Sequence, residues 1–125
     1  KKKILNKKYI FNHYKNLIKE QKKIKFLNYD ENGTNNWLIN IKIDLKKNIN
    51  KKIIEYLNKK NIEVRPIFTP FTNLRYLKKY EKYKVKNLLK KTKNCISIPS
   101  GPDLKYKEIK KISEAIIRFV DDEKN

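Results

Sequence analysis

The stretch NNWLINIKID, residues 35–44, is the clearest strand in this sequence. Its large apolar side chains fall on alternate positions, at Trp37, Ile39, Ile41 and Ile43. Polar residues stand between them, at Asn40, Lys42 and Asp44. A period of two places one set of side chains on each face of a strand. We therefore predict a sheet with one covered face, which carries Trp37 and the isoleucines, and one polar face.

Before this strand, residues 1–22 carry apolar side chains at three- and four-residue spacings: Leu5, Tyr9, Ile10, Tyr14, Leu17 and Ile18. This pattern predicts a long helix. Residues 23–30, KIKFLNYD, are expected to form a short strand, and Asn32-Gly33 is typical of a turn.

After the strand, a helix is expected over about residues 48–60, with Asn48 as its N-cap. Residues 61–68 predict a strand, residues 73–91 two helical pieces, and residues 94–100 a strand that Pro99 ends. The two helical pieces are indicated by Leu74, Leu77, Val85, Leu88 and Leu89. The closing helix, with Asp103 as the expected cap, has Ile109, Ile112, Ile116 and Phe119 at core spacing.

Strands and helices thus alternate along a chain of 125 residues and 15.2 kDa, which is the size of one domain. We predict an α/β fold, an α+β sandwich in which helices cover a small mixed or antiparallel sheet of three or four strands. Val64 and Ile96 are expected on the covered face beside the isoleucines. The helix at 1–22 is expected to lie along one edge of the sheet, with part of its apolar face exposed.

The formal net charge of +20 raises the question of a polyanionic partner. Arginine occurs only at positions 65, 75 and 118, and lysine supplies the rest of the positive charge in every segment. Nucleic-acid binding proteins rely strongly on arginine for its fork of donors. The composition therefore favours a solvated basic surface over a nucleic-acid patch.

Other classes of site find little support in the sequence. Cys95 lies in an apolar run and is expected to be a buried strand thiol, and His13 has no second ligand at metal-binding spacing. No run approaches the roughly 18 apolar residues of a membrane span. We expect no metal, no membrane and a reducing, cytoplasmic setting.

The segment RPIFTPFTNLRYL, residues 65–77, is unusually stiff and aromatic for this chain. Pro66 fixes φ, so that the guanidinium of Arg65 is held at the rim of a loop. Such an arginine suits an anionic ligand, or it pairs with a surface carboxylate such as Glu63 or Asp103. Two roles are also open for Phe68, which could fill the core or form an aromatic wall beside a ligand.

In order and spacing, these elements resemble the C-terminal small domain of the DegT/DnrJ/EryC1/StrS family. Its members are sugar aminotransferases that depend on pyridoxal 5'-phosphate (PLP) and have the aspartate-aminotransferase fold, fold type I. The resemblance covers essentially the whole chain. Its sharpest parts are NWL at 36–38, RPIFTP at 65–70 and IPS at 98–100.

The resemblance implies that the complete enzyme transfers an amino group, typically from glutamate, to a keto sugar on a nucleotide, for surface polysaccharide or glycan biosynthesis. It implies a homodimer, and substrate contacts by Arg65, Phe68 and Thr72. The family usually has Trp where Phe68 stands and His where Thr72 stands. A threonine hydroxyl can donate a hydrogen bond but does not titrate near neutral pH. This departure bears on substrate choice.

No Schiff-base lysine, pyridine-facing carboxylate or Gly/Ser-rich phosphate loop is identifiable, so no catalytic residue is assigned to this chain. The family carries them in a large domain upstream, to which residues 1–22 would form a bridge. We therefore expect the chain by itself to bind no PLP and to be inactive. One alternative is a PLP-dependent sugar dehydratase of the same superfamily. The other is a stand-alone basic nucleic-acid-binding module, which would need lysines and aromatic residues on one open sheet face.

Overall fold

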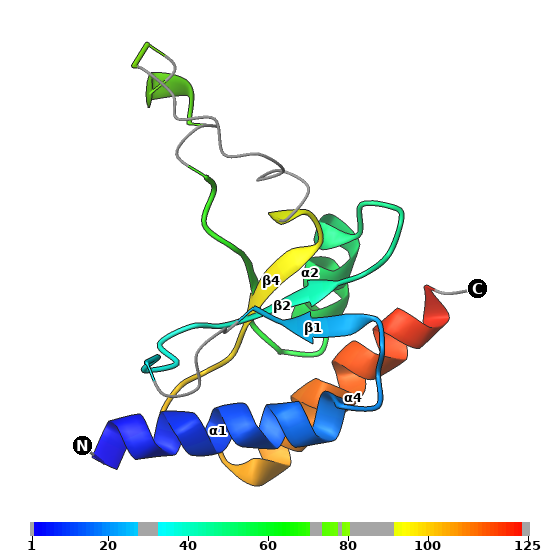
Figure 1. The fold of residues 1–125 in the computed structure, drawn as a ribbon. Helices are drawn as coiled ribbons and strands as arrows, with labels where there is room; N and C mark the ends of the chain where they lie inside the picture. The colour runs from blue at the N-terminus through cyan, green and yellow to red at the C-terminus, as the bar shows by residue number, and fades with distance from the viewer. Residues whose placement is uncertain (1, 28–32, 71–73, 78, 81–91, 124–125) are drawn as a thin grey trace.

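A computed structural model describes residues 2–27, 33–70, 74–77, 79–80 and 92–123 of the chain. These residues form two layers, a small sheet and a set of helices (Figure 1). The elements are α1 (Lys2–Ile18), β1 (Ile24–Phe26), β2 (Ile39–Ile43), α2 (Asn50–Asn58), β3 (Arg65–Pro66), the 3-10 turn η2 (Arg75–Leu77), β4 (Cys95–Ile98) and α4 (Tyr106–Asp122). The predicted α/β class is confirmed.

The four strands pair in the order β1-β2-β4-β3, and each neighbouring pair is antiparallel. Ile41 of β2 is the partner of Phe26 on one side and of Ile96 on the other. This register puts the apolar side chains of neighbouring strands on one face of the sheet. Buried there are Ile24, Ile39, Ile41, Ile43, Ile96 and Ile98.

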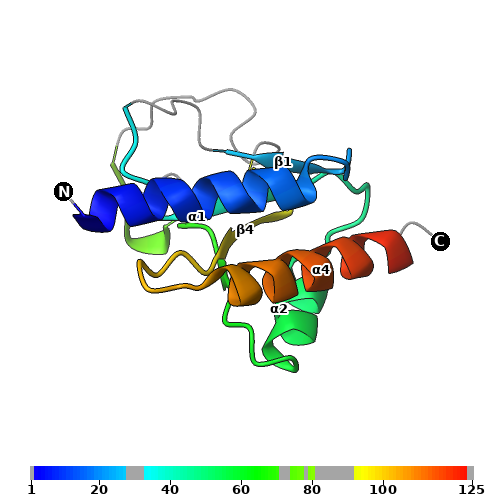
Figure 2. The same cartoon turned by 90° about the horizontal axis from the view of Figure 1, so that it is seen from below.

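Three helices cover this apolar face. Figure 2 shows α4 between α1 and α2, and α4 contacts both of them. The apolar side chains predicted for the closing helix, Ile109, Ile112, Ile116 and Phe119, are all buried. Helix α1 lies beside the edge strand β1, as expected, where the rings of Phe11 and Phe26 meet with their centroids 5.4 Å apart. The exposed apolar residues of α1 are Ile4, Leu5 and Tyr9.

The prediction that Trp37 lies on the covered face is wrong, because its side chain is 65% exposed. Asn36 adopts a left-handed φ of 50°, which interrupts the extended backbone just before it reaches β2. The amide of Trp37 then donates to Oδ1 of Asn35 at 2.9 Å. Strand β2 therefore begins at Ile39, and its period of two does not extend back to Trp37.

Both predicted helix caps are wrong. Helix α2 has Ile49 at its N-cap position, while Oδ1 of Asn48 accepts a hydrogen bond from the amide of Asn50 at 3.3 Å. Helix α4 has Lys105 at its N-cap position instead of Asp103, and the side chain of Glu108 accepts a hydrogen bond from the amide of Lys105 at 2.8 Å. A glutamate inside the first turn thus satisfies the free amide from within the helix.

Several expected elements are shorter or fall outside the described residues. The strand expected over 61–68 is reduced to Arg65–Pro66, although Val64 before it is buried as predicted. Helix α1 ends at Ile18 instead of continuing to residue 22, and the chain turns there into β1. Within 73–91 the structure describes the 3-10 turn Arg75–Leu77, whereas residues 81–91, with Val85, Leu88 and Leu89, lie outside the described part, as does Asn32.

Asn94 organises the connection between β2 and α2. It has a left-handed φ of 58° and its side chain is buried. Its Nδ2 donates to the carbonyls of Leu45 and Lys47, at 2.9 Å each, and its Oδ1 accepts the amide of Ile49 at 3.0 Å. One side chain therefore satisfies three backbone groups of a loop. The next residue, Cys95, is buried as predicted, and burial raises the pKa of its thiol.

Glu123, just after α4, connects this helix to α2 through ion pairs that we expect to be sensitive to acid. Its carboxylate meets the ammonium of Lys47 at 3.0 Å and that of Lys52 at 3.3 Å. These hydrogen bonds, that from Lys47 first, lower the pKa of Glu123. A carboxylate whose pKa is lower in the folded state stabilises the protein above its unfolded pKa of about 4.3. That contribution is lost as the pH falls through the folded-state pKa.

We therefore expect Glu123→Gln to lower the urea midpoint of unfolding at a pH of about 7, and to lower it by less at a pH of about 3. Glu114→Gln is the matched control, because that glutamate sits on the exposed side of α4, 3.9 Å from Lys110. A Glu123→Gln deficit of the same size at both pH values would show that the contact does not depend on the charge.

Candidate functional site

The candidate site begins on the sheet face that the helices leave uncovered. Arg65 of β3 pairs with Ser97 of β4, and Ser97 pairs in turn with Asn40 of β2. Because their neighbours Ile96 and Ile41 face the helices, these three residues lie in one row on the opposite face. The hydroxyl of Ser97 donates to Oδ1 of Asn40 at 2.6 Å. One guanidinium and two neutral polar side chains therefore lie next to one another on this face.

Arg65 is held by a neighbouring carboxylate. Its Nε and Nη2 donate to Oε1 of Glu63, at 3.0 Å and 2.5 Å. Both side chains are open to solvent, with 77% of Arg65 and 73% of Glu63 exposed. Of the two surface carboxylates considered from the sequence, Glu63 is the partner. The contact of Arg65 with a substrate anion stays a prediction.

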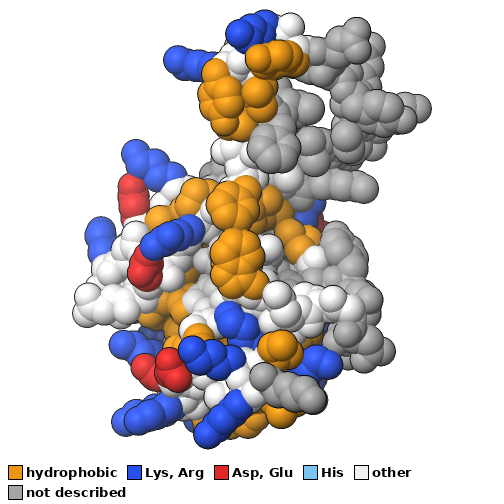
Figure 3. All heavy atoms as spheres, turned by 90° about the vertical axis from the view of Figure 1, so that its left-hand side faces the viewer, with side chains coloured by type: hydrophobic (Ala, Val, Ile, Leu, Met, Phe, Trp, Pro, Cys, Tyr) orange, Lys and Arg blue, Asp and Glu red, His pale blue; other side chains and the backbone are white. Residues whose placement is uncertain are grey.

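Beyond Arg65 the chain leaves the sheet as an arm, which we define as the described residues 67–70, 74–77 and 79–80. It projects on the side opposite to α1 and α4 (Figure 1). Phe68 is 76% exposed, so it is not core filler, and Tyr76 and Tyr80 are exposed as well. Figure 3 shows hydrophobic side chains gathered at the tip of the arm and in a second patch on the body of the molecule. Thr72 and Phe71 lie outside the described residues.

The IPS turn after β4 joins α1 to the segment around Trp37. The ammonium of Lys7 donates to the carbonyl of Ser100 at 2.8 Å and to that of Trp37 at 3.2 Å. The hydroxyl of Ser100 donates to the same Trp37 carbonyl at 2.9 Å. The Tyr14 hydroxyl donates to the carbonyl of Pro99 at 3.0 Å. Every one of these bonds goes to a backbone carbonyl, as an architectural role predicts.

Burial changes the acidity of the two side chains from α1 in this junction. It lowers the pKa of Lys7, and it raises that of Tyr14, to which the charge of Glu108 adds. Lys7 was missed by sequence reasoning, because nothing in its position distinguishes it from the lysines around it. Only the return of the chain at Ser100 gives this ammonium its partners.

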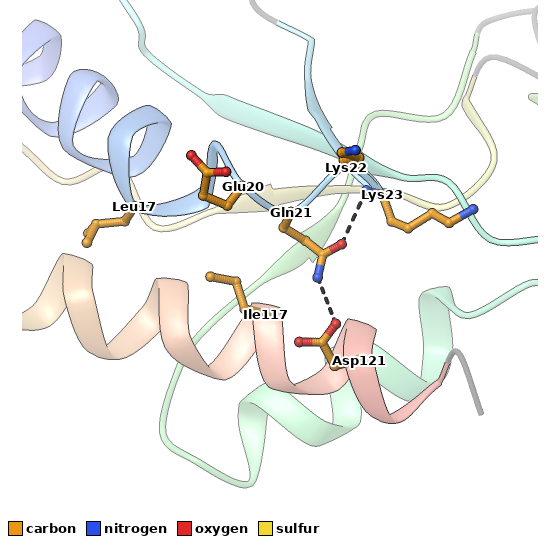
Figure 4. Close-up of a pocket in the computed structure, with 7 residues that line it drawn as sticks. All are labelled: Leu17, Glu20, Gln21, Lys22, Lys23, Ile117 and Asp121. Carbon is orange, nitrogen blue, oxygen red and sulfur yellow. Dashed lines mark hydrogen bonds between the residues drawn. The ribbon is translucent and has the colours of Figure 1, made fainter.

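A cleft with a volume of ≈ 530 Å³ lies at the other end of α1, where the helix leads into β1 (Figure 4). Gln21 spans it, since its Nε2 donates to Asp121 of α4 at 2.9 Å and its Oε1 accepts the amide of Lys23 at 3.3 Å. Both signs of charge line the cleft, with Glu20 and Asp121 against Lys22 and Lys23. Gln21 therefore acts as a structural link between α4 and the turn that joins α1 to β1.

His13 lies on α1 among aromatic side chains. The His13 ring packs between Tyr9 and Tyr106, with centroid distances of 4.1 Å and 4.9 Å. No group of three or more His, Cys, Asp or Glu side chains that could hold a metal ion occurs in the described part of the chain.

None of the described helices has both the length and the apolar character needed to cross a bilayer.

The two-layer fold indicates the class of protein to which the chain belongs, and the sequence profile then gives the family. It is the fold found in part of the sugar aminotransferases of PLP fold type I, with which the structure superposes closely. The chain belongs to the DegT/DnrJ/EryC1/StrS aminotransferase family, whose sequence profile matches residues 1–117. The resemblance seen in the sequence motifs is thereby confirmed. No protein with a curated record matches the chain.

Three solved structures illustrate the likeness. PseC of Helicobacter pylori, an aminotransferase of pseudoaminic acid biosynthesis, has a TM-score of 0.81 at 18% identity over 95% of this chain and 33% of its own. DesI in the presence of its TDP-sugar product has a TM-score of 0.79 at 13% identity, over 94% and 31%. The GDP-4-keto-6-deoxy-D-mannose-3-dehydratase of E. coli has a TM-score of 0.74 at 21% identity, over 91% and 31%. The chain therefore spans about a third of the length of these proteins.

Proposed function

We propose that this chain is the C-terminal small domain of a PLP-dependent nucleotide-sugar aminotransferase. The complete enzyme would transfer an amino group, from glutamate, to a keto sugar on a nucleotide, for surface polysaccharide or glycan biosynthesis. The family match over residues 1–117 carries this proposal. Two structural neighbours support it: PseC, an aminotransferase of pseudoaminic acid biosynthesis, and DesI, solved in the presence of its TDP-sugar product. The enzyme would work in the cytoplasm as a homodimer.

PLP, when bound, supplies the electron sink for the amino transfer. The described residues do not fit this cofactor. A PLP site needs a lysine that projects into a shaped pocket. Among the described lysines, Lys7 is the one with a lowered pKa, and it is bonded to two backbone carbonyls. The only described glycines are Gly33 and Gly101, so no glycine-rich phosphate loop is formed. We propose that a large domain outside this chain holds the cofactor and that this chain alone is inactive.

The part of this chain would be to complete the substrate cleft. Arg65 would contact an anionic group of the substrate, Phe68 would offer an apolar wall, and Thr72 would stand where the family places its histidine. The exposure of Arg65 and of Phe68 supports this assignment, since both side chains are open to a partner surface. Prolines 66 and 70 limit the backbone freedom that is lost on binding.

A sugar dehydratase is the second candidate. The GDP-4-keto-6-deoxy-D-mannose-3-dehydratase of E. coli, whose structure contains bound hydrated PLP, shares this fold. The two reactions are separated by product analysis of the full-length protein. With a nucleotide keto sugar and glutamate, an aminotransferase forms an amino sugar, whereas a dehydratase forms a sugar that has lost a hydroxyl group. An amino-free product would overturn our first proposal.

The uncovered sheet face gives little support to a nucleic-acid module. Apart from the buried Cys95, its described residues are Lys25, Asn40, Lys42, Arg65 and Ser97, and none of them is aromatic. Binding of single strands needs aromatic rings on which the bases stack. The exposed aromatic residues lie instead on the arm, on α1 and α4, and at Trp37.

In the full-length enzyme, Arg65→Ala is expected to lower kcat/KM for the amino donor or for the nucleotide sugar by at least about tenfold, near 1.4 kcal/mol. The loss would come from an anion left without its guanidinium partner. Stability should change little, because an exposed ion pair contributes only about 0 to 1 kcal/mol. Steady-state kinetics and a thermal melt measure the two effects.

Arg118→Ala is the matched control, since it removes the same charge from the exposed side of α4, in the helix layer. It should leave kcat/KM unchanged. Unaltered kinetics in Arg65→Ala together with a large fall in Tm would make Arg65 a structural ion-pair residue.

A further inference from the structure

The position of Glu63 relative to Arg65 follows from the extended backbone that leads into β3. Side chains alternate there between the two sides of the chain, since Ile62 and Val64 are buried while Glu63 and Arg65 are exposed. Residues two apart on an extended chain share a side. The carboxylate of Glu63 therefore lies on the same side as the guanidinium, where any anion that binds Arg65 must also lie.

The geometry of the pair is that of a replaceable contact. Nε and Nη2 of Arg65 both donate to the single oxygen Oε1 of Glu63. The stronger arrangement of arginine and an oxyanion uses two parallel bonds to two different oxygens. A phosphate or carboxylate ligand could form that fork, whereas Glu63 in this position does not. The high exposure of both side chains adds solvent screening.

We infer that Glu63 is a built-in competitor for the anion-binding side of Arg65, and that it sets the affinity of this site for oxyanions. The inference rests on the proposed function, in which Arg65 contacts a substrate anion. The ligand is a phosphate or a carboxylate, such as those of a nucleotide sugar or of an amino-acid donor. To bind it through the Nε–Nη2 edge, Arg65 must give up Glu63, and the binding energy is reduced by the strength of that pair.

We therefore expect one substitution that removes the charge of Glu63 to raise the affinity of Arg65 for anions. Glu63→Gln keeps the size of the side chain but removes its charge. Exposed ion pairs are worth a factor of about two to five in an equilibrium constant, so anion affinity should rise by about two- to fivefold. Because the pair is on the surface, the substitution should leave the fold intact.

The direct test follows the side-chain Nε–H signals of the arginines by NMR, in the parent chain and in Glu63→Gln. Only Arg65, Arg75 and Arg118 contribute such signals, so each can be assigned by substitution. Inorganic pyrophosphate and glutamate are titrated separately, which distinguishes a phosphate from a carboxylate source. We expect the Arg65 signal to shift with saturation for one of the two anions, and the Kd to be about two- to fivefold lower in Glu63→Gln.

Two controls separate competition from general electrostatics in a chain of net charge +20. The Arg118 signal reports non-specific anion binding, because that residue lies in the helix layer. Glu20→Gln makes the same change of charge at an exposed site near the end of α1. It should leave the Kd at Arg65 unchanged. Equal tightening in Glu20→Gln and Glu63→Gln would overturn the inference.

A kinetic cycle in the full-length enzyme provides the second measurement. Glu63→Gln should lower KM for the substrate whose anion Arg65 contacts, and should have no effect once Arg65→Ala is present. If Arg65→Ala impairs the enzyme but Glu63→Gln changes neither KM nor the Kd, only the competition by Glu63 is disproved. If the Arg65 signal responds to neither anion and Arg65→Ala has normal kinetics, the proposed substrate contact fails, and the inference fails with it.

Discussion

Asn94→Ala is expected to lower the free energy of unfolding by about 3 to 5 kcal/mol. The substitution removes three hydrogen bonds at once, and it leaves the carbonyls of Leu45 and Lys47 and the amide of Ile49 without their partner. Each buried polar group left unsatisfied costs about 1 to 3 kcal/mol. The left-handed backbone at φ 58° adds to the cost, because alanine adopts it less readily than asparagine does.

The measurement is urea unfolding, with Asn61→Ala as the matched control. Asn61 has nearly the same φ, 57°, but its side chain is exposed. Asn61→Ala therefore isolates the backbone cost, which should be about 1 to 2 kcal/mol. Asn94→Gly isolates the cost of the lost hydrogen bonds, since glycine adopts the left-handed backbone readily but makes no side-chain hydrogen bond. Equal losses in Asn94→Ala and Asn61→Ala would mean that the three hydrogen bonds contribute nothing to stability.

Ile41→Ala is expected to cost about 3 to 4 kcal/mol, because it opens a cavity in the centre of the core. Ile41 is fully buried on β2, and its register partners are Phe26 of β1 and Ile96 of β4. The helices pack on the same face, so the surrounding side chains have little room to collapse into the space. Denaturant unfolding with an unchanged m-value would assign the loss to the folded state.

Lys25→Ala provides the contrast for the two faces of the sheet. Lys25 is exposed on β1 and stands on the uncovered face, 3.9 Å from the carboxylate of Asp44. Its replacement should change stability by no more than about 0.5 kcal/mol. A cost for Lys25→Ala that approaches that of Ile41→Ala would contradict the two-layer arrangement, since it would require both faces to be packed.

Local patterns in the sequence determined the two central strands, the closing helix and the family. The buried side chains follow the period of two at Ile39, Ile41 and Ile43, and the helical spacing from Ile109 to Phe119. Sequence patterns predict these positions because burial of apolar surface is the dominant favourable contribution to folding. The motifs at 36–38, 65–70 and 98–100 pointed to the family that the profile over residues 1–117 then confirmed. Where a single local residue broke the pattern, as Asn36 does before Trp37, periodicity predicted the wrong face.

Tertiary structure alone decided the polar contacts. The hydrogen-bond partners of Asn94 are separated from it by 45 to 49 positions along the chain. Lys7 and Ser100 are separated by 93 positions. Neither pairing therefore leaves a trace in the local sequence. For Arg65, the sequence allowed Glu63 or Asp103 as a partner, and the extended backbone that places Glu63 on the same side selected it. Hydrophobic burial depends on the period of a segment, whereas a hydrogen bond depends on the position of two particular atoms. Those positions exist only once the helices and strands have packed.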